Sequence, residues 1–255
     1  MYDQVRLYAR GLAIAVALTV SSAAGAATLN ISTFDPSDLS GALAAVDALR
    51  KPGEASVSEN FEDFTAWKPG AKTWKQNPTT AVGTFTSIGG EGQGSSVIGD
   101  ATKLQVRGDA PMAWNRINTG HGGNNWLDSN DTHGMEWDVG GMPSFDALSF
   151  ILTDVADQGG KFSIQIGDQM FSEVLGASGR LVDGGIYVVS ILLPEAVSSL
   201  SVLLHNDTLK DGFGIDNIHV ALQSPSPVPL PPAALLIVAG MGSIAVARRR
   251  RSTGA

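Results

Sequence analysis

The sequence contains no cysteine. This absence excludes disulfide bonds, thiolate metal sites and cysteine nucleophiles in one step. The folded part of the chain must therefore be stabilised by an apolar core or by metal ions that bind other ligands. A body of about 165 residues is large enough to bury such a core.

Basic side chains are also scarce. The chain has 25 acidic and 17 basic residues, a net charge of −8. Once residues 1–26 and the arginines at 248–251 are set aside, 24 acidic and 11 basic side chains are left, a net charge of −13. Such a body repels nucleic acid and anionic membranes, whereas cationic partners or divalent cations suit it. We therefore do not expect nucleic acid as a partner.

Recognisable catalytic motifs are missing as well. The four histidines show neither H-E-x-x-H nor another metal-ligand spacing, and no G-x-S-x-G motif is present. The glycines at 89–94 lack the spacing of a dinucleotide-binding loop. The sequence thus favours a non-enzymatic protein. A secreted glycan-active hydrolase stays open as an alternative, because the separation of a glycosidase carboxylate pair cannot be judged from sequence.

Residues 1–26 have the three parts of a secretory signal peptide. Arg6 and Arg10 supply the positive charge, residues 11–20 are apolar, and residues 24–26 read A-G-A. We predict cleavage before Ala27. An uncleaved membrane helix is the alternative, and the short apolar run argues against it.

The C-terminal end also reads in three parts. Residues 223–232 hold five prolines, which predict an extended spacer. Residues 233–247 carry no charge and are predicted to form a transmembrane helix, because residues 228–232 extend the apolar run to about 20 residues. Four arginines then follow and are predicted to stop transfer, so that residues 248–255 form a basic cytoplasmic tail. These are Arg248, Arg249, Arg250 and Arg251.

Immediately before the apolar block, the spacer contains Val228, Pro229, Leu230 and Pro231. This motif, the apolar block and the arginine cluster together resemble the VPLPA-CTERM variant of the PEP-CTERM sorting signals of Gram-negative bacteria. The resemblance implies processing by an exosortase, a membrane-embedded cysteine protease-transpeptidase. It also implies an inner-membrane intermediate and a final place at the cell surface or in the extracellular exopolysaccharide matrix. Pro232 stands where the family pattern has alanine, so the processing position stays open. A simple tail-anchored membrane protein, without any sorting step, is the alternative.

Between these targeting segments the chain is rich in short β-like runs separated by Gly, Asn, Asp and Pro. Residues 162–166 alternate strictly between apolar and polar, and residues 186–193 are apolar on both faces, as in a strand covered on both sides. The predicted strands are 61–64, 82–87, 103–107, 115–118, 135–139, 147–153, 162–167, 170–175, 186–193, 200–205 and 213–222. Together they predict an all-β fold, an antiparallel β-sandwich of jelly-roll type over residues 57–222. Residues 27–56 are predicted to be an N-terminal segment with one short helix within 35–50, where apolar residues recur at helical spacing.

The apolar phase of the last predicted strand slips at Asp216 and Asn217. This slip predicts either a strand covered on both faces or a bulge. Residues 211–220 and 61–64 resemble the last and first strands of the carbohydrate-binding-module-like jelly rolls found in many PEP-CTERM proteins. The resemblance implies that an acid from each terminal strand holds a structural calcium ion. The candidate ligands are Glu62, Asp63 and Asp216, since calcium prefers oxygen; alternatively, these acids cap strand ends and face water.

Aromatic and polar side chains gather on glycine-rich loops at residues 114–126. Indole faces stack on sugar rings, and cationic or imidazole groups donate hydrogen bonds to hydroxyls, so these loops are a candidate glycan site. The candidate residues are Trp114, Arg116, His121 and Trp126. The alternative is a core tryptophan with ordinary loop packing. The sequence as a whole predicts an exported structural or adhesive protein, with an exosortase, a membrane and a polysaccharide as partners.

Overall fold

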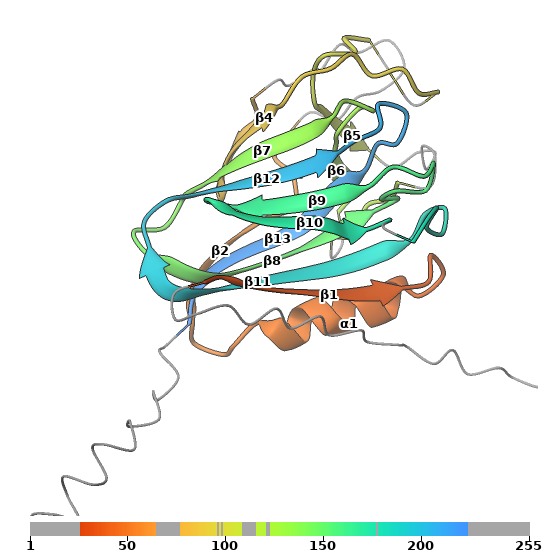
Figure 1. The fold of residues 1–255 in the computed structure, drawn as a ribbon. Helices are drawn as coiled ribbons and strands as arrows, with labels where there is room; N and C mark the ends of the chain where they lie inside the picture. The colour runs from red at the N-terminus through yellow and green to blue at the C-terminus, as the bar shows by residue number, and fades with distance from the viewer. Residues whose placement is uncertain are drawn as a thin grey trace, which may run out of the picture. The chain divides into compact units, whose positions relative to one another are not determined.

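The structure, a computed structural model, describes residues 26–64, 77–95, 97, 99–108, 116–120, 123–176 and 178–223, and it leaves out the side chains of 172–174. Within these ranges the chain forms two antiparallel sheets and one helix (Figure 1). The predictions for residues 1–25 and 224–255 lie outside the described residues. These predictions include the sorting motif, the transmembrane helix and the four arginines.

The larger sheet has the strand order β1-β11-β8-β13-β6-β5, and β2 also pairs with β13. Its strands are β1 (Thr28–Phe34), β2 (Ala55–Glu59), β5 (Gln105–Gly108), β6 (Asn125–Asp128), β8 (Phe145–Thr153), β11 (Ile186–Val197) and β13 (Gly214–Leu222).

The smaller sheet has the order β10-β9-β12-β7-β4-β3. Its strands are β3 (Thr79–Thr80), β4 (Gly83–Ser87), β7 (Gly134–Val139), β9 (Phe162–Ile166), β10 (Gln169–Leu175) and β12 (Leu200–Asn206). The predicted antiparallel β-sandwich with one short N-terminal helix is thereby confirmed.

The single helix explains why one strand is apolar on both faces. Helix α1 (Leu39–Leu49) begins at Asp38, whose carboxylate accepts a hydrogen bond from the Gly41 N–H. The helix buries Ala42 and Val46 in a small apolar cluster that β8 and β11 complete from the outer face of the larger sheet. On its other face, β11 contributes Val189 and Ile191 to the main core between the sheets. The prediction of a strand covered on both sides is therefore confirmed for β11.

Several aromatic side chains pack against one another in the main core. Trp137 stacks on Phe85 with the ring centroids 5.4 Å apart and meets Phe150 edge-on at 5.9 Å. Its indole N–H is also satisfied, since it donates to the Val82 carbonyl at 3.0 Å. Each such ring pair contributes about 0.5–1.5 kcal/mol beyond area burial. The core thus provides the stabilisation that disulfide bonds cannot supply here.

Two predicted strands are wrong. Residues 61–64 form a turn, because the Glu59 carboxylate accepts the backbone N–H groups of Asn60 and Phe61 and so ends β2. Phe61 then takes a φ of 58°, outside the extended region of a regular strand, and buries its ring in the core. In 116–118, Arg116 makes one isolated bridge rather than a strand, since its side chain is drawn into ion pairs described below.

Four strands were not predicted from the sequence, including the two-residue β3 at the edge of the smaller sheet. The segment 27–56 supplies β1 and β2 to the larger sheet, and β6 follows the glycine-rich loop. Strand β1 pairs along its whole length with β11, from Thr28 opposite Leu192 to Phe34 opposite Ile186. The sandwich therefore includes residues that precede position 57.

Both alternatives predicted for the last strand are found together, since β13 is buried on both faces and also contains a bulge. The pairing of β13 with β8 shifts between Asp216, opposite Ile151, and His219, opposite Ser149. The extra residue, Asn217, has a φ of 50°, and its side-chain oxygen accepts a hydrogen bond from Arg50 Nη2 at 2.8 Å. The end of α1 thus helps to hold the bulge in place.

The strand register also defines two opposite ends of the sandwich. At one end, Thr28 lies in register with Leu192, which pairs with Ala147, and Ala147 also pairs with Ala221. At the other end, Thr153 pairs with both Ile186 and Gly214. The described chain therefore enters the sandwich and leaves it at the same end. No helix among the described residues is long and apolar enough to cross a membrane.

Candidate functional site

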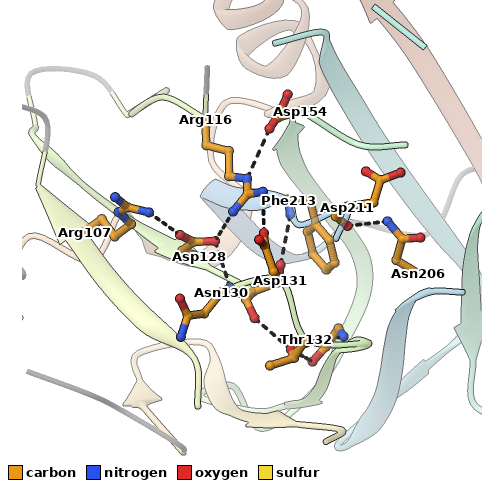
Figure 2. Close-up of polar contacts among 12 residues, drawn as sticks. Arg107, Arg116, Asp128, Asn130, Asp131, Thr132, Asp154, Asn206, Asp211 and Phe213 are labelled. Carbon is orange, nitrogen blue, oxygen red and sulfur yellow. Dashed lines mark hydrogen bonds and ion pairs between the residues drawn. The ribbon is translucent and has the colours of Figure 1, made fainter. Parts of the chain in front are cut away.

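Arg116 lies at the centre of a buried ion-pair network at the end of the sandwich where β13 begins (Figure 2). It is only 3% exposed. Its guanidinium contacts Asp128 at 2.9 Å, Asp131 at 2.7 Å and Asp154 at 3.2 Å. Burial by itself lowers the pKa of Arg116, but the three carboxylates raise it above its usual value. The arginine therefore acts as a permanent positive charge that joins three acidic loop residues.

Arg107 extends this network toward β5. Its Nη1 lies 2.8 Å from the second carboxylate oxygen of Asp128, so Asp128 bridges two arginines. The Arg107 guanidinium also lies over the Trp126 ring, 5.6 Å from its centroid. This cation–π contact covers one face of the indole.

The loop after β6 holds its carboxylates in place through an unusual backbone conformation. Asn130 and Asp131 have φ values of 55° and 59°, which Asn and Asp tolerate better than most residues. Asp128 accepts a hydrogen bond from the Asn130 N–H at 2.8 Å, and Ser129 Oγ accepts one from the Phe213 N–H at 2.9 Å. The loop is thus fixed both to itself and to the residue before β13.

A pocket of about 370 Å³ opens beside Arg116. Its lining includes three aspartates from two loops: Asp154 and Asp157 follow β8, and Asp183 precedes β11. One carboxylate oxygen from each of the three lies within 4.8 Å of the others. In the described part of the chain this is the one group of three acids or histidines that comes so close, and it could hold a metal ion.

The three carboxylates differ in burial. Asp154 is 2% exposed and Asp157 is 4% exposed, while Asp183 faces solvent. Burial raises the pKa of Asp154 to about 8, and Asp157 and Asp183 act in the same direction, against the ion pair with Arg116. Asp154 also accepts a hydrogen bond from the Gly184 N–H at 2.9 Å, which ties the two pocket loops together.

A fourth carboxylate, Asp211, lies against Asp157. One of its oxygens accepts hydrogen bonds from the Gly160 and Gln158 N–H groups, at 2.7 and 3.2 Å. Its other oxygen is buried and has no hydrogen-bond partner. Burial raises the pKa of Asp211 to about 6, and the Asp157 carboxyl pushes it in the same direction.

The candidate glycan site is only partly within the described residues, since Trp114 and His121 lie outside them. Trp126 is 1% exposed, packed in the sandwich, with Arg107 over its ring. Arg116 is buried among three carboxylates. Trp126 is thus covered within the sandwich, whereas Arg116 lines the acidic pocket, and the glycan site at these residues stays a prediction.

Glu62 and Asp216 both contact the segment around residues 119–125, but the three predicted calcium ligands do not form a close group. Glu62 accepts the backbone N–H groups of Asn124 and Asn125, both at 2.6 Å. Asp216 accepts the Thr119 N–H at 2.7 Å through one oxygen, while its other oxygen is buried without a partner. Burial raises the pKa of Asp216 to about 7. Asp63 is exposed. The calcium prediction at these residues stays a prediction.

Ser58, His219 and Glu54 are connected in the manner of a hydrolase triad. Ser58 Oγ lies 3.0 Å from His219 Nδ1, and His219 Nε2 lies 2.7 Å from Glu54. The cavity beside His219 measures about 10 Å³, room for a single water. An acyl substrate does not fit in this cavity. The hydrogen bonds therefore have a structural role: they connect β2, β13 and the segment before β2.

Sequence patterns do not predict the acidic pocket. Its aspartates come from loops at 154–157, 183 and 211, and their mutual proximity depends on the pairing of β8 with both β11 and β13. The one sequence feature that could have indicated the pocket is that these acids lie just after or just before predicted strands.

Comparisons with known proteins give only distant likenesses. No protein-family model matches the chain, and no curated protein sequence matches it. Among solved structures, the K2 cleaved adhesin domain of Lys-gingipain is similar with a TM-score of 0.41 and 12% identity, over 66% of this chain and 99% of that one. The CBM22-1 xylan-binding domain from Paenibacillus barcinonensis Xyn10C gives a TM-score of 0.36 and 16% identity, over 69% of this chain and 100% of that one. The Agl-KA catalytic domain gives 0.28 and 11%, over 64% and 31%. These scores are too low to support an argument about function.

Proposed function

We propose that this chain is an exported, non-enzymatic β-sandwich protein of a Gram-negative cell surface or extracellular matrix, with a structural or adhesive role. A signal peptide at 1–26 and an exosortase-type sorting signal around Val228–Pro231 would deliver it. The observation that carries the proposal is the position of the first and last residues of the described sandwich. Ala27 and Gln223 both lie at the end of the sandwich opposite the acidic pocket.

This arrangement suits a domain that is attached through its C-terminus. The Gln223 N–H donates to Asp146 at 2.7 Å, so the chain is held at the base of the sandwich until the proline-rich spacer begins. A tether there leaves the pocket end and its loops free to face outward. Contact with a matrix polysaccharide would then occur at those loops, whereas the excess of acidic residues disfavours nucleic acid.

A glycan-active hydrolase is the second candidate, because the pocket holds carboxylates close together. Two features count against it. Asp154 is engaged by Arg116 and the Gly184 N–H, and no aromatic side chain is among the described residues that line the pocket. Release of reducing sugar from matrix polysaccharide by the wild-type protein, and its loss in Asp157→Asn, would favour the hydrolase.

Mass spectrometry of the mature protein from its native host tests the proposal. We expect an N-terminus at Ala27 and a C-terminus that lacks Arg248–Arg251. The double variant Pro229→Ala/Pro231→Ala should keep the arginines and accumulate in the inner membrane. Pro225→Ala/Pro227→Ala, which changes the same spacer outside the motif, is the matched control and should be processed normally.

Two outcomes would contradict this proposal. Surface protein that retains all four arginines would favour a simple tail anchor. A reporter fused after Gln223 that stays cytosolic would exclude export altogether.

A further inference from the structure

We propose that Asp154, Asp157 and Asp183 bind one divalent cation of the hard, oxygen-seeking kind, with calcium as the best fit. This site is distinct from the calcium ligands predicted from the sequence, and it does not depend on how the protein is exported. The geometry is the first argument. Calcium binds oxygens at about 2.3–2.6 Å, so two of its ligands lie at most about 5 Å apart.

The three carboxylate oxygens, all within 4.8 Å of one another, meet that limit without movement of the backbone. Magnesium demands a near-ideal octahedron, gives up its water reluctantly and usually takes only one or two carboxylates from a protein. Carboxylates on two loops match the looser calcium shell better.

Asp211 supplies a second, independent observation. Its side chain is 0% exposed, and one of its oxygens is buried with no hydrogen-bond partner, on a carboxyl that lies against Asp157. Two facing carboxylates need either a shared proton or a cation between or beside them. A cation bound to Asp157 supplies the missing positive charge for both.

The local charge balance points the same way. Six carboxylates belong to the network and the pocket, while four cationic side chains, Arg107, Arg116, Arg180 and Lys210, accompany them. The acids are Asp128, Asp131, Asp154, Asp157, Asp183 and Asp211. Arg116 is already shared by three of them, so it does not neutralise the rest. One divalent ion would bring the group close to neutrality.

The site is also accessible. Asp183 is exposed, and the pocket of about 370 Å³ leaves room for water or another oxygen ligand to complete the ion's shell. A bound ion would join the loop after β8 to the loop before β11, and through Asp157 it would steady Asp211 before β13. We therefore expect calcium to rigidify this end of the sandwich.

The test uses the purified full-length chain, freed of metal with a chelator and titrated calorimetrically with calcium chloride or magnesium chloride. We expect one calcium ion per chain and weaker magnesium binding. At calcium about 100 times above Kd, the thermal midpoint should rise by about 5 °C or more. Asp183→Asn and Asp157→Asn should weaken calcium binding at least about tenfold.

Asp138→Asn is the matched control, since it removes an exposed aspartate from β7 near the opposite end of the sandwich. Its calcium affinity should equal that of the wild type. Because Asp183 is exposed, its variant is expected to fold even if Asp157→Asn does not. A second readout is trypsin cleavage after Arg180, which calcium should slow in the wild type and in Asp138→Asn but not in Asp183→Asn.

Two results would overturn the assignment. One is the absence of any calcium heat and any thermal shift in the wild-type chain. The other is a calcium response that persists in Asp157→Asn and Asp183→Asn but disappears in Asp216→Asn, which would place the ion at the residues predicted from the sequence.

Discussion

The acids in two regions of this sandwich are stabilised by different means. Beside the segments 118–120 and 123–125, Glu62 accepts two backbone N–H groups, both at 2.6 Å. In the pocket at 154–211, several aspartates face one another, and Arg116 is the buried positive charge among them. A single carboxylate can be satisfied by N–H dipoles, whereas facing carboxylates repel one another and require full positive charge.

The largest effect is expected where the buried cation is removed. Arg116→Met leaves Asp128, Asp131 and Asp154 without their shared partner and should lower the free energy of unfolding by about 3–5 kcal/mol. Urea denaturation measures this loss. Lys103→Met, which breaks the partly exposed ion pair with Asp100, is the control and should cost less than about 1 kcal/mol. Equal losses of unfolding free energy in the two variants would mean that the buried ion pairs of Arg116 stabilise the fold no more than the partly exposed pair of Lys103.

An intermediate effect is expected at the acid that N–H groups satisfy. Glu62→Ala leaves the N–H groups of Asn124 and Asn125 without an acceptor and should cost about 1–3 kcal/mol. The loss should be the same with calcium and with chelator, measured by thermal or urea unfolding. Glu62→Gln keeps an acceptor oxygen and should lose less. A loss that depends strongly on calcium would show that Glu62 holds an ion.

The smallest effect is expected at Asp211, and its sign should change with calcium. In chelated protein, Asp211→Asn keeps an oxygen for the Gly160 N–H and removes the repulsion with Asp157, so stability should be unchanged or higher by up to about 1 kcal/mol. With calcium present the variant should gain less stability than the wild type. Unfolding curves recorded with chelator and with calcium measure the two stabilities. A clear loss of stability of Asp211→Asn in chelated protein would show that Asp157 and Asp211 do not repel one another.

Local sequence patterns predicted much of the sandwich. Strands β7, β8, β9, β11 and β12 follow from alternation or from apolar runs between turn residues, because side chains in a strand point to opposite faces in turn. The bulge at Asp216–Asn217 followed from a slip in that alternation. Strand β1 was missed, since an edge strand beside a helix needs no strong pattern of its own.

The candidate sites were harder to predict, because each depends on residues that only the fold brings together. Trp126 and Arg116 have the chemistry of a sugar site, but the fold uses them in the core and in an ion-pair network. Asp157 and Asp211 are 54 positions apart in the chain, and only the pairing of β13 with β8 brings their loops together. No spacing rule in the sequence encodes that distance.

The sequence by itself determined the absence of disulfides, the acidic surface, the all-β texture and the predicted targeting segments at both ends. These follow from composition and from patterns that span a few neighbouring residues. Only the tertiary structure decided which carboxylates meet, which are satisfied by N–H groups and which lack a partner. The physical reason is that electrostatic interaction depends on separation in space and on burial, and both are set by contacts between strands far apart in the chain.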